Sequence, residues 1–283
     1  MQYKGFIPKL ALLISAFSLL SGISRAQYNE AGILVGWSSY KGELAEHLFK
    51  NKLNDFGGGV FFRHNWNRHW SWKLAVNYGR VEGDDALASN DFAVDRNLSF
   101  YSNVLDISPV IEFNFFPYET GNRYYPFTPY IFTGISVFHF NPKAELGNDV
   151  YELQPLTTEG EKGYKRFQVA IPIGGGIKFT AGRIGIGIEV GARRTYTDYL
   201  DDVSTVYPEL NQLLAAKGQT AVSLSDRSFS SRDTTSIVPS SYLKQRGNSQ
   251  DKDWYLFGGV TLYFRLTSLL RDICKPFKNR RYI

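Results

Sequence analysis

The sequence predicts an all-β fold: a transmembrane, antiparallel, up-and-down β-barrel of about eight strands, with long external loops and short periplasmic turns. Three observations lead to this prediction. They are an export signal at the N-terminus, segments whose hydrophobicity alternates from residue to residue, and connections that are alternately short and long.

The N-terminus has the layout of a secretory signal peptide, which we expect to span residues 1–26. Lys4 and Lys9 precede an apolar stretch from Leu10 to Leu20, and Ser24 and Ala26 place small residues at the cleavage positions. A membrane-spanning helix needs roughly 20 apolar residues, so the short stretch favours a cleaved signal peptide over an N-terminal anchor. The mature chain then consists of an outer-membrane barrel at 27–266 and a basic periplasmic tail at 267–283.

Composition agrees with an exported barrel and argues against a helical membrane protein. Aromatic residues make up 16% of the 283-residue chain and glycines number 26, yet the mean hydropathy is negative and no later apolar run reaches helix-spanning length. In a membrane barrel one face of each strand meets lipid and the other meets a polar interior, which produces this composition. We therefore expect outer-membrane lipid as a partner, and no nucleic acid, because the chain is exported and its net charge of +5 is modest.

Alternation with a period of two residues identifies the strands. It is clearest at 70–79, where every second residue is apolar and the others are small or polar. Four further segments show the same pattern: 28–40, 105–115, 168–179 and 184–193. Three segments are strand-like, but which of their faces is apolar is ambiguous: 57–65, 128–140 and 253–266.

The connections favour a membrane barrel over a soluble one. Those near Asn67 and Gly182 are very short, the one at 117–127 is moderate, and the others are long, with the last running over 196–252. Such alternation is typical of outer-membrane barrels, whose periplasmic turns are short and external loops long. The alternative, a soluble lipocalin-like barrel with its apolar face inward, would turn the charged face of the strands outward to water.

The charged residues of the strands alternate onto the face opposite the apolar one, so we expect them in the barrel interior. An eight-stranded barrel has room only for its own side chains. We interpret the set as a lumen charge network that holds the barrel rigid; the functional alternative is a narrow conductive path. The predicted network comprises Glu30, Lys73, Asp106, Glu112, Lys178, Glu189 and Arg193.

Signals for an enzyme are weak, and we predict none. His69 and Ser71 have the His-x-Ser spacing of an outer-membrane lipid A deacylase family, a spacing that lets an imidazole activate a hydroxyl. The predicted topology puts His69 at a periplasmic turn, whereas such an enzyme works on the external leaflet. We also predict no small-molecule substrate and no cofactor.

No metal site is predicted either. The remaining histidines lack ligand partners at metal-binding spacing. Asp198, Asp201 and Asp202 could offer oxygen ligands to calcium, but they lack the glycine turn of a dedicated loop. A solvated, hydrogen-bonding rim is the favoured interpretation of this run.

Four loop segments are distinctive: DRNLSF at 95–100, FNPKAELG at 140–147, YELQPLTTEG at 151–160 and TYTDYLDDVS at 195–204. They resemble segments of a Bacteroidetes outer-membrane barrel family that includes the type IX secretion-associated protein PorG. The most distinctive residues of the last segment form a family-like loop motif: Thr197, Asp198, Tyr199, Leu200, Asp201 and Asp202. The resemblance implies a non-catalytic barrel that sits with the type IX secretion machinery and contacts its periplasmic ring proteins.

The surfaces available for such a partner are the basic tail and the loop at 117–127. In that loop Tyr118, Arg123, Tyr124 and Tyr125 combine aromatic and arginine side chains, which suit an interface. The alternative is that these aromatics belong to the membrane girdle and that the tail meets anionic headgroups. The function that follows is a structural or accessory role in type IX secretion, with a small porin-like or adhesin-like barrel as the alternative.

Overall fold

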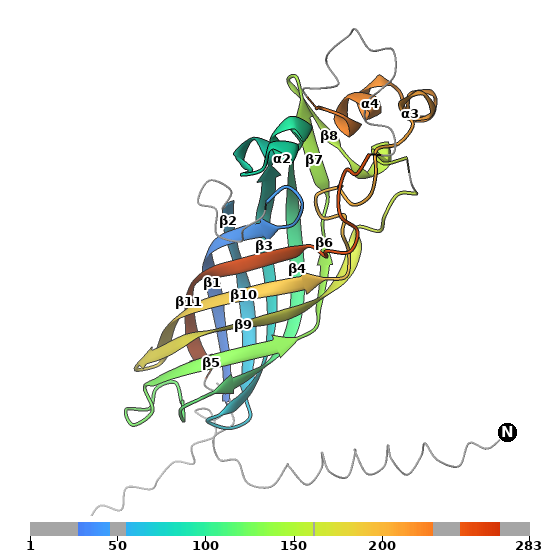
Figure 1. Ribbon diagram of the computed structural model, residues 1–283. Helices are drawn as coiled ribbons and strands as arrows, with labels where there is room; N and C mark the ends of the chain where they lie inside the picture. Colours follow the sequence, from blue (N-terminus) through green and yellow to red (C-terminus); the bar gives the residue numbers. More distant parts are fainter. Residues whose placement is uncertain (1–27, 46–54, 161, 229–243, 267–283) are drawn as a thin grey trace, which may run out of the picture.

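The computed structural model describes residues 28–45, 55–160, 162–228 and 244–266. The predicted signal peptide at 1–26 and the predicted periplasmic tail at 267–283 lie outside the described residues. Within the described residues the chain forms one large antiparallel sheet that closes on itself, with an elaborate cap at one end (Figure 1).

Nine strands form a closed ring with eight positions, which confirms the predicted fold class. β5 and β6 share one position, because both pair with β4 on one side and β9 on the other and are separated only at Ile135. Pairing of β1 with β11 closes the ring, so no edge of the barrel is left unpaired. The ring strands are β1 (Tyr28–Lys41), β2 (Asp55–Asn65), β3 (Trp70–Asp84), β4 (Ser99–Asn114), β5 (Phe127–Gly134), β6 (Ser136–His139), β9 (Phe167–Ala181), β10 (Ile184–Thr195) and β11 (Trp254–Leu266).

The outer face of the ring is apolar. Along β10, Ile184, Ile186 and Ile188 are each half exposed, while the residues between them point inward. The same alternation runs through β4, as the sequence predicts. An apolar exterior around a polar interior is the reverse of a soluble lipocalin-like barrel, so that alternative is excluded and the barrel spans a membrane.

Aromatic side chains gather on the outer face at the end that carries the short turns. They form two groups of three rings, in which the centroids of rings in contact lie 4.7 to 6.2 Å apart. Their members are Trp70, Phe113, Phe115, Phe116, Phe127 and Phe179. Rings at this position match the interfacial girdle of membrane barrels, and the short turns mark this end as periplasmic.

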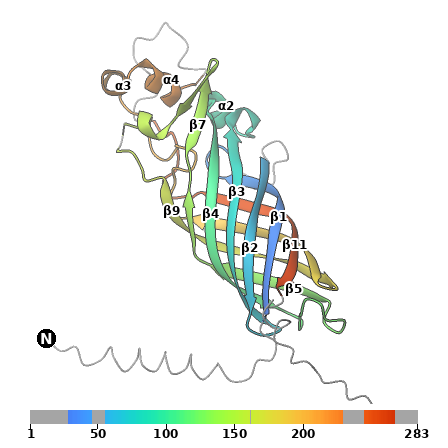
Figure 2. The same ribbon diagram turned by 180° about the vertical axis from the view of Figure 1, so that it is seen from behind.

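The long connections build a cap over the opposite, external end (Figures 1 and 2). The hairpin of β7 (Pro142–Leu146) and β8 (Asp149–Glu152) extends from the external end of β4. No helix among the described residues is long and apolar enough to cross a membrane. The helical elements, all of them in the cap, are η1 (Asp85–Leu87), α2 (Asp91–Arg96), η2 (Gln154–Leu156), α3 (Leu210–Lys217) and α4 (Gln219–Ser225).

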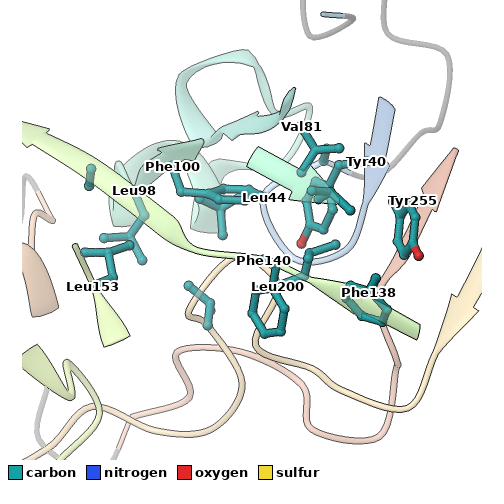
Figure 3. Packing of buried hydrophobic residues seen from close by; sticks show 14 of the residues in the cluster. Tyr40, Leu44, Val81, Leu98, Phe100, Phe138, Phe140, Leu153, Leu200 and Tyr255 are labelled. Atoms are coloured by element: carbon teal, nitrogen blue, oxygen red, sulfur yellow. The ribbon is translucent and has the colours of Figure 1, made fainter. Parts of the chain in front are cut away.

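A hydrophobic core lies where the cap meets the barrel (Figure 3). Tyr40 and Phe100 meet edge to face with centroids 5.0 Å apart, and Phe138 lies 5.0 Å from the ring of Tyr255. Leu200 of the β10–β11 loop is fully buried in the same cluster. Burial of these side chains anchors the external loops to the top of the barrel.

Inward glycines make room for the large aromatic side chains of the narrow interior. A Cβ atom on Gly185 would lie 2.0 Å from the ring of Tyr263, and one on Gly174 would lie 2.4 Å from the ring of Phe132. Such contacts are impossible for a larger residue without displacing the ring. Glycine is therefore required at these two positions by close approach.

Candidate functional site

The barrel interior is filled by ionisable side chains that converge on Glu112 of β4. Its carboxylate lies 2.8 Å from Nε of Arg63, 3.0 Å from Nζ of Lys73 and 2.6 Å from Nζ of Lys178. All four side chains are buried, with at most 2% exposed. Glu112 thus accepts from three cations that come from three other strands.

Two further carboxylates extend this network across the lumen. Glu30 lies 2.8 Å from Nη1 of Arg63 and also accepts the hydroxyl proton of Thr120. Glu189 lies 2.7 Å from Nζ of Lys73 and accepts from the Tyr130 hydroxyl at 2.5 Å. Every strand-borne charge in this layer therefore has an opposite charge in contact, as burial of charges requires.

Asp106 is the centre of a second polar cluster nearer the cap. It accepts hydrogen bonds from Asn77 at 2.9 Å, from Tyr255 at 2.8 Å and from the hydroxyls of Ser108 and Ser136. Nη2 of Arg193 lies 3.7 Å from the same carboxylate. The seven predicted lumen residues are thus all buried inside the barrel, in two neighbouring clusters.

Arg63 is the lumen residue that the sequence reasoning missed. With it, the buried charged side chains of the described ring strands number four cations and four anions. They are Arg63, Lys73, Lys178 and Arg193 against Glu30, Asp106, Glu112 and Glu189. The predicted set of three cations and four anions carried an unbalanced charge, and that imbalance was the available signal for a missing cation.

Two buried arginines tie the external loops together. Arg96 forms a 2.7 Å ion pair with Asp85 and donates to the backbone carbonyls of Glu43 and Arg246. Arg246 lies 3.0 Å from the carboxylate of Glu159 and donates to the backbone carbonyl of Asp202 at 2.6 Å. Since these partners come from all four external connections, the cap is one hydrogen-bonded unit.

The cap contains an acidic trio, which we define as Glu43, Asp201 and Asp253. One oxygen of each lies within 4.8 Å of the others. The Tyr40 hydroxyl lies 2.6 Å from Asp201 and 3.1 Å from Asp253, so its one proton can serve either carboxylate. Three oxygens at this spacing could share a divalent cation of the calcium type or could be held together by protons.

Burial and mutual repulsion raise the pKa values of the trio. Desolvation, followed by the charge of Asp201, raises the pKa of Glu43 to about 9. Desolvation raises the pKa of Asp201 to about 7 and that of Asp253 well above its usual range, with repulsion from neighbouring carboxylates adding to it. The trio therefore retains protons near neutral pH unless a cation replaces them.

The predicted solvated rim at Asp198, Asp201 and Asp202 is wrong. All three carboxylates are buried, because the family-like loop motif from Thr197 to Asp202 folds down onto the barrel. They also do not form one ligand set. Asp198 accepts from Ser204, Asp202 accepts from Thr158 and Tyr164, and only Asp201 joins the trio.

The predicted periplasmic contact surface is divided by the structure. Tyr118 is 1% exposed and its hydroxyl lies 2.7 Å from that of Tyr263, so its assignment to the surface is wrong: it points into the mouth of the barrel. Tyr125 is partly buried, with the guanidinium of Arg68 4.3 Å from its ring. Arg123 and Tyr124 are exposed, Tyr124 to 87%.

The His69 and Ser71 side chains have other partners than each other. The His69 ring nitrogen lies 2.9 Å from the carbonyl oxygen of Asn114 at the periplasmic turn. Ser71 is fully buried and donates to Glu112. The hydroxyl therefore belongs to the lumen network and no nucleophile–base pair is formed by these two residues.

The sequence matches the family model described as "Domain of unknown function (DUF6089)" over residues 9–217. No curated protein matches the sequence.

Among solved structures, the chain resembles three bacterial surface proteins at low identity. Neisserial surface protein A is 8% identical with a TM-score of 0.39, and the match covers 85% of this chain and 97% of that one. A major outer membrane protein from Thermus thermophilus is 10% identical with a TM-score of 0.39, covering 86% and 100%. Ail, the attachment invasion locus protein of Yersinia pestis, solved with the heparin analogue sucrose octasulfate, is 10% identical with a TM-score of 0.38, covering 84% and 99%.

Substitution of Glu112 by Gln should destabilise the barrel strongly. It removes the carboxylate shared by three buried cations, and breaking a buried ion pair in this way costs about 3–5 kcal/mol. The measurement is urea-induced unfolding in phospholipid vesicles, followed by tryptophan fluorescence. The matched control is Glu152→Gln, which removes an exposed carboxylate paired with Arg166 and should cost about 0–1 kcal/mol. Equal, small losses for both variants would contradict a neutralising lumen network.

Opening of the cap should become easier as pH rises from 6 to 9. The folded-state pKa values of Glu43 and Asp201 lie above the unfolded values of about 4, so their protonated forms favour the folded cap and this stabilisation is lost as pH rises through about 7 to 9. Hydrogen exchange of the Leu200 and Val203 amides, which donate to the trio, reports the opening once intrinsic rates are divided out.

Between pH 6 and 9, protection should change less in Asp253→Asn than in wild type, because this variant removes one repelling carboxylate. It should change as much as in wild type in Asp149→Asn, an exposed control in the β7–β8 hairpin. A wild-type protection factor that stays constant from pH 6 to 9 would rule out a proton-held trio.

Proposed function

We propose a structural role in protein export for this chain, which belongs to the family described as a domain of unknown function (DUF6089). In this proposal the chain is a non-enzymatic outer-membrane barrel that acts as an accessory component of type IX secretion. The observation that carries the structural part of the proposal is the filled lumen. The eight buried charged side chains and the aromatic side chains between them fill the interior, so the barrel acts as a rigid body in the membrane.

The filled lumen argues against the porin-like alternative. Ions would have to pass Arg63, Lys73 and Lys178, each of which is already engaged by a carboxylate at 3.0 Å or less. Eight-stranded barrels leave no aqueous channel when their interior side chains pack in this way. Above the network, the hydrophobic core and the two cap arginines close the external end.

The periplasmic face supports a docking role. Tyr124 is 87% exposed at the tip of the β4–β5 connection, and Arg123 beside it is exposed as well. Their connection is held in place by Glu119, which pairs with Arg68 and Arg265 at 3.3 Å. A tethered loop that presents an aromatic and an arginine side chain has the composition favoured at protein interfaces.

The secretion part of the proposal is supported by the resemblance of the loop segments to the Bacteroidetes family described above. It makes the periplasmic ring proteins of the type IX machinery the expected partners of Arg123 and Tyr124. The competing assignment of Tyr124 is the membrane girdle, where it would touch lipid headgroups instead of protein.

Deletion of the gene should cause selective retention of type IX cargo inside the cell. Cargo in the medium and on the cell surface would be measured while other outer-membrane proteins are checked for normal levels. Complementation by wild type should restore export, and complementation by Tyr124→Asp should fail, since a carboxylate at the exposed tip weakens an aromatic contact.

The matched control is Tyr196→Asp, which changes another exposed tyrosine, at the external end, and should restore export fully. Normal export after deletion would refute the secretion role. If deletion abolishes export of the cargo but Tyr124→Asp restores it fully, only the proposed docking surface is refuted.

A further inference from the structure

Three residues form a row across neighbouring strands at the external end of the barrel. Lys41 of β1 pairs in register with Trp254 of β11, and Trp254 pairs with Arg194 of β10. Lys41 and Arg194 are exposed and Trp254 is partly exposed. An indole thus lies between two cations on three adjacent strands.

The row lies on the outer face, at the upper edge of the apolar belt. Trp254 and Val260 are separated by six residues and therefore point to the same side of β11, and Val260 is a half-exposed residue of the belt. Six residues span about 20 Å along a strand, which a tilt of about 40° reduces to about 15 Å along the membrane normal. That is about half the thickness of a hydrocarbon core. With Val260 near the middle of the belt, Trp254 and its two neighbours therefore lie at the level of the lipid headgroups.

The surface beside the row is hollowed and carries more cations than anions. Lys41, Arg194, Trp254 and Lys252 line a hollow together with residues of the 248–252 loop. Two acids, Glu43 and Asp251, line it as well. Because burial raises the pKa of Glu43 to about 9, Glu43 adds little negative charge at neutral pH. The other charged side chains that line the hollow are Asp251 and the three cations.

Three other cations of the external end have carboxylate partners. Arg80 lies 3.1 Å from Asp55, and Arg166 lies 2.7 Å from Glu152, which is also 3.7 Å from Lys143. Among the described residues, no carboxylate lies within the 4.0 Å of an ion pair from Lys41 or Arg194. Within the described part of the chain, these two side chains are therefore available to an external anion.

We propose that Lys41, Trp254 and Arg194 bind the phosphate groups of the phosphorylated glycolipid in the external leaflet. The guanidinium of Arg194 and the ammonium of Lys41 supply donors for phosphate oxygens, and the indole of Trp254 packs against the adjoining acyl and sugar groups at the interface. The outward direction of the row and its height above the belt identify a lipid headgroup, rather than a soluble anion, as the occupant.

The binding site is tested with the purified full chain in detergent micelles. Native mass spectrometry would count bound lipid during titration with phosphorylated lipid A, and parallel titrations would use dephosphorylated lipid A and inorganic phosphate. The test variant carries Lys41→Gln and Arg194→Gln. The matched control carries Lys143→Gln and Arg166→Gln, which remove two cations of the cap that are paired with Glu152. Heat-modifiable mobility on gels establishes that each variant is folded.

We expect wild type and control to bind phosphorylated lipid A equally and the test variant to bind it about thirtyfold more weakly, given about fivefold for each basic residue near a headgroup. Dephosphorylated lipid should bind wild type as weakly as phosphorylated lipid binds the test variant. Unchanged binding in the folded test variant, or equal affinity of wild type for both lipids, would overturn the proposal. Displacement of the lipid by millimolar inorganic phosphate would assign the site to a soluble anion and overturn it equally.

Discussion

Charge neutrality inside a narrow barrel is the constraint on which the rest of the structure depends. Three cations from β2, β3 and β9 meet the single carboxylate of Glu112. Glu30 and Glu189 provide a second carboxylate for two of them, the cations of β2 and β3. Water is largely excluded from this space, so each charge requires an opposite charge in contact. A barrel filled in this manner must present its apolar side chains outward, and lipid is the environment that accepts them.

The network also explains how the two ends of the molecule differ. Toward the periplasm the interior ends in tyrosine hydroxyls, with Tyr118 and Tyr263 closing the mouth. Toward the outside the polar layer is followed by an aromatic core. The external loops pack on this core, and hydrogen bonds from Arg96 and Arg246 hold the loops together. The barrel therefore joins a short periplasmic face to a large ordered cap without an open path between them.

Strand positions and the facing of most strands could be predicted from sequence, because a membrane barrel imposes a period of two on every segment. Three segments were ambiguous, and β2 shows the reason most clearly. In β2, apolar Phe61 points inward while Phe62 points outward, so both faces look apolar and Arg63 could not be assigned to the lumen. The inward Phe61 lies beneath the guanidinium of Arg63, whose central carbon is 4.9 Å from the ring centroid.

The loops could not be predicted, because their contacts join residues far apart in sequence. Tyr40 meets Asp201 across 161 positions, and the acidic trio combines residues from two different connections. A run of aspartates looks solvated in isolation, and only a folded cap supplies the donors that bury it. Tyr118 likewise has the sequence context of a surface aromatic, and only the closed barrel places Tyr263 opposite it.

Single-channel recording in planar bilayers tests the central claim, a lumen closed by neutralised charges, most directly. The purified barrel should show no stable conducting state, since every lumen cation is engaged by a carboxylate and the external end is capped. Discrete, reproducible openings of the wild-type protein would contradict the account and would make the barrel a pore.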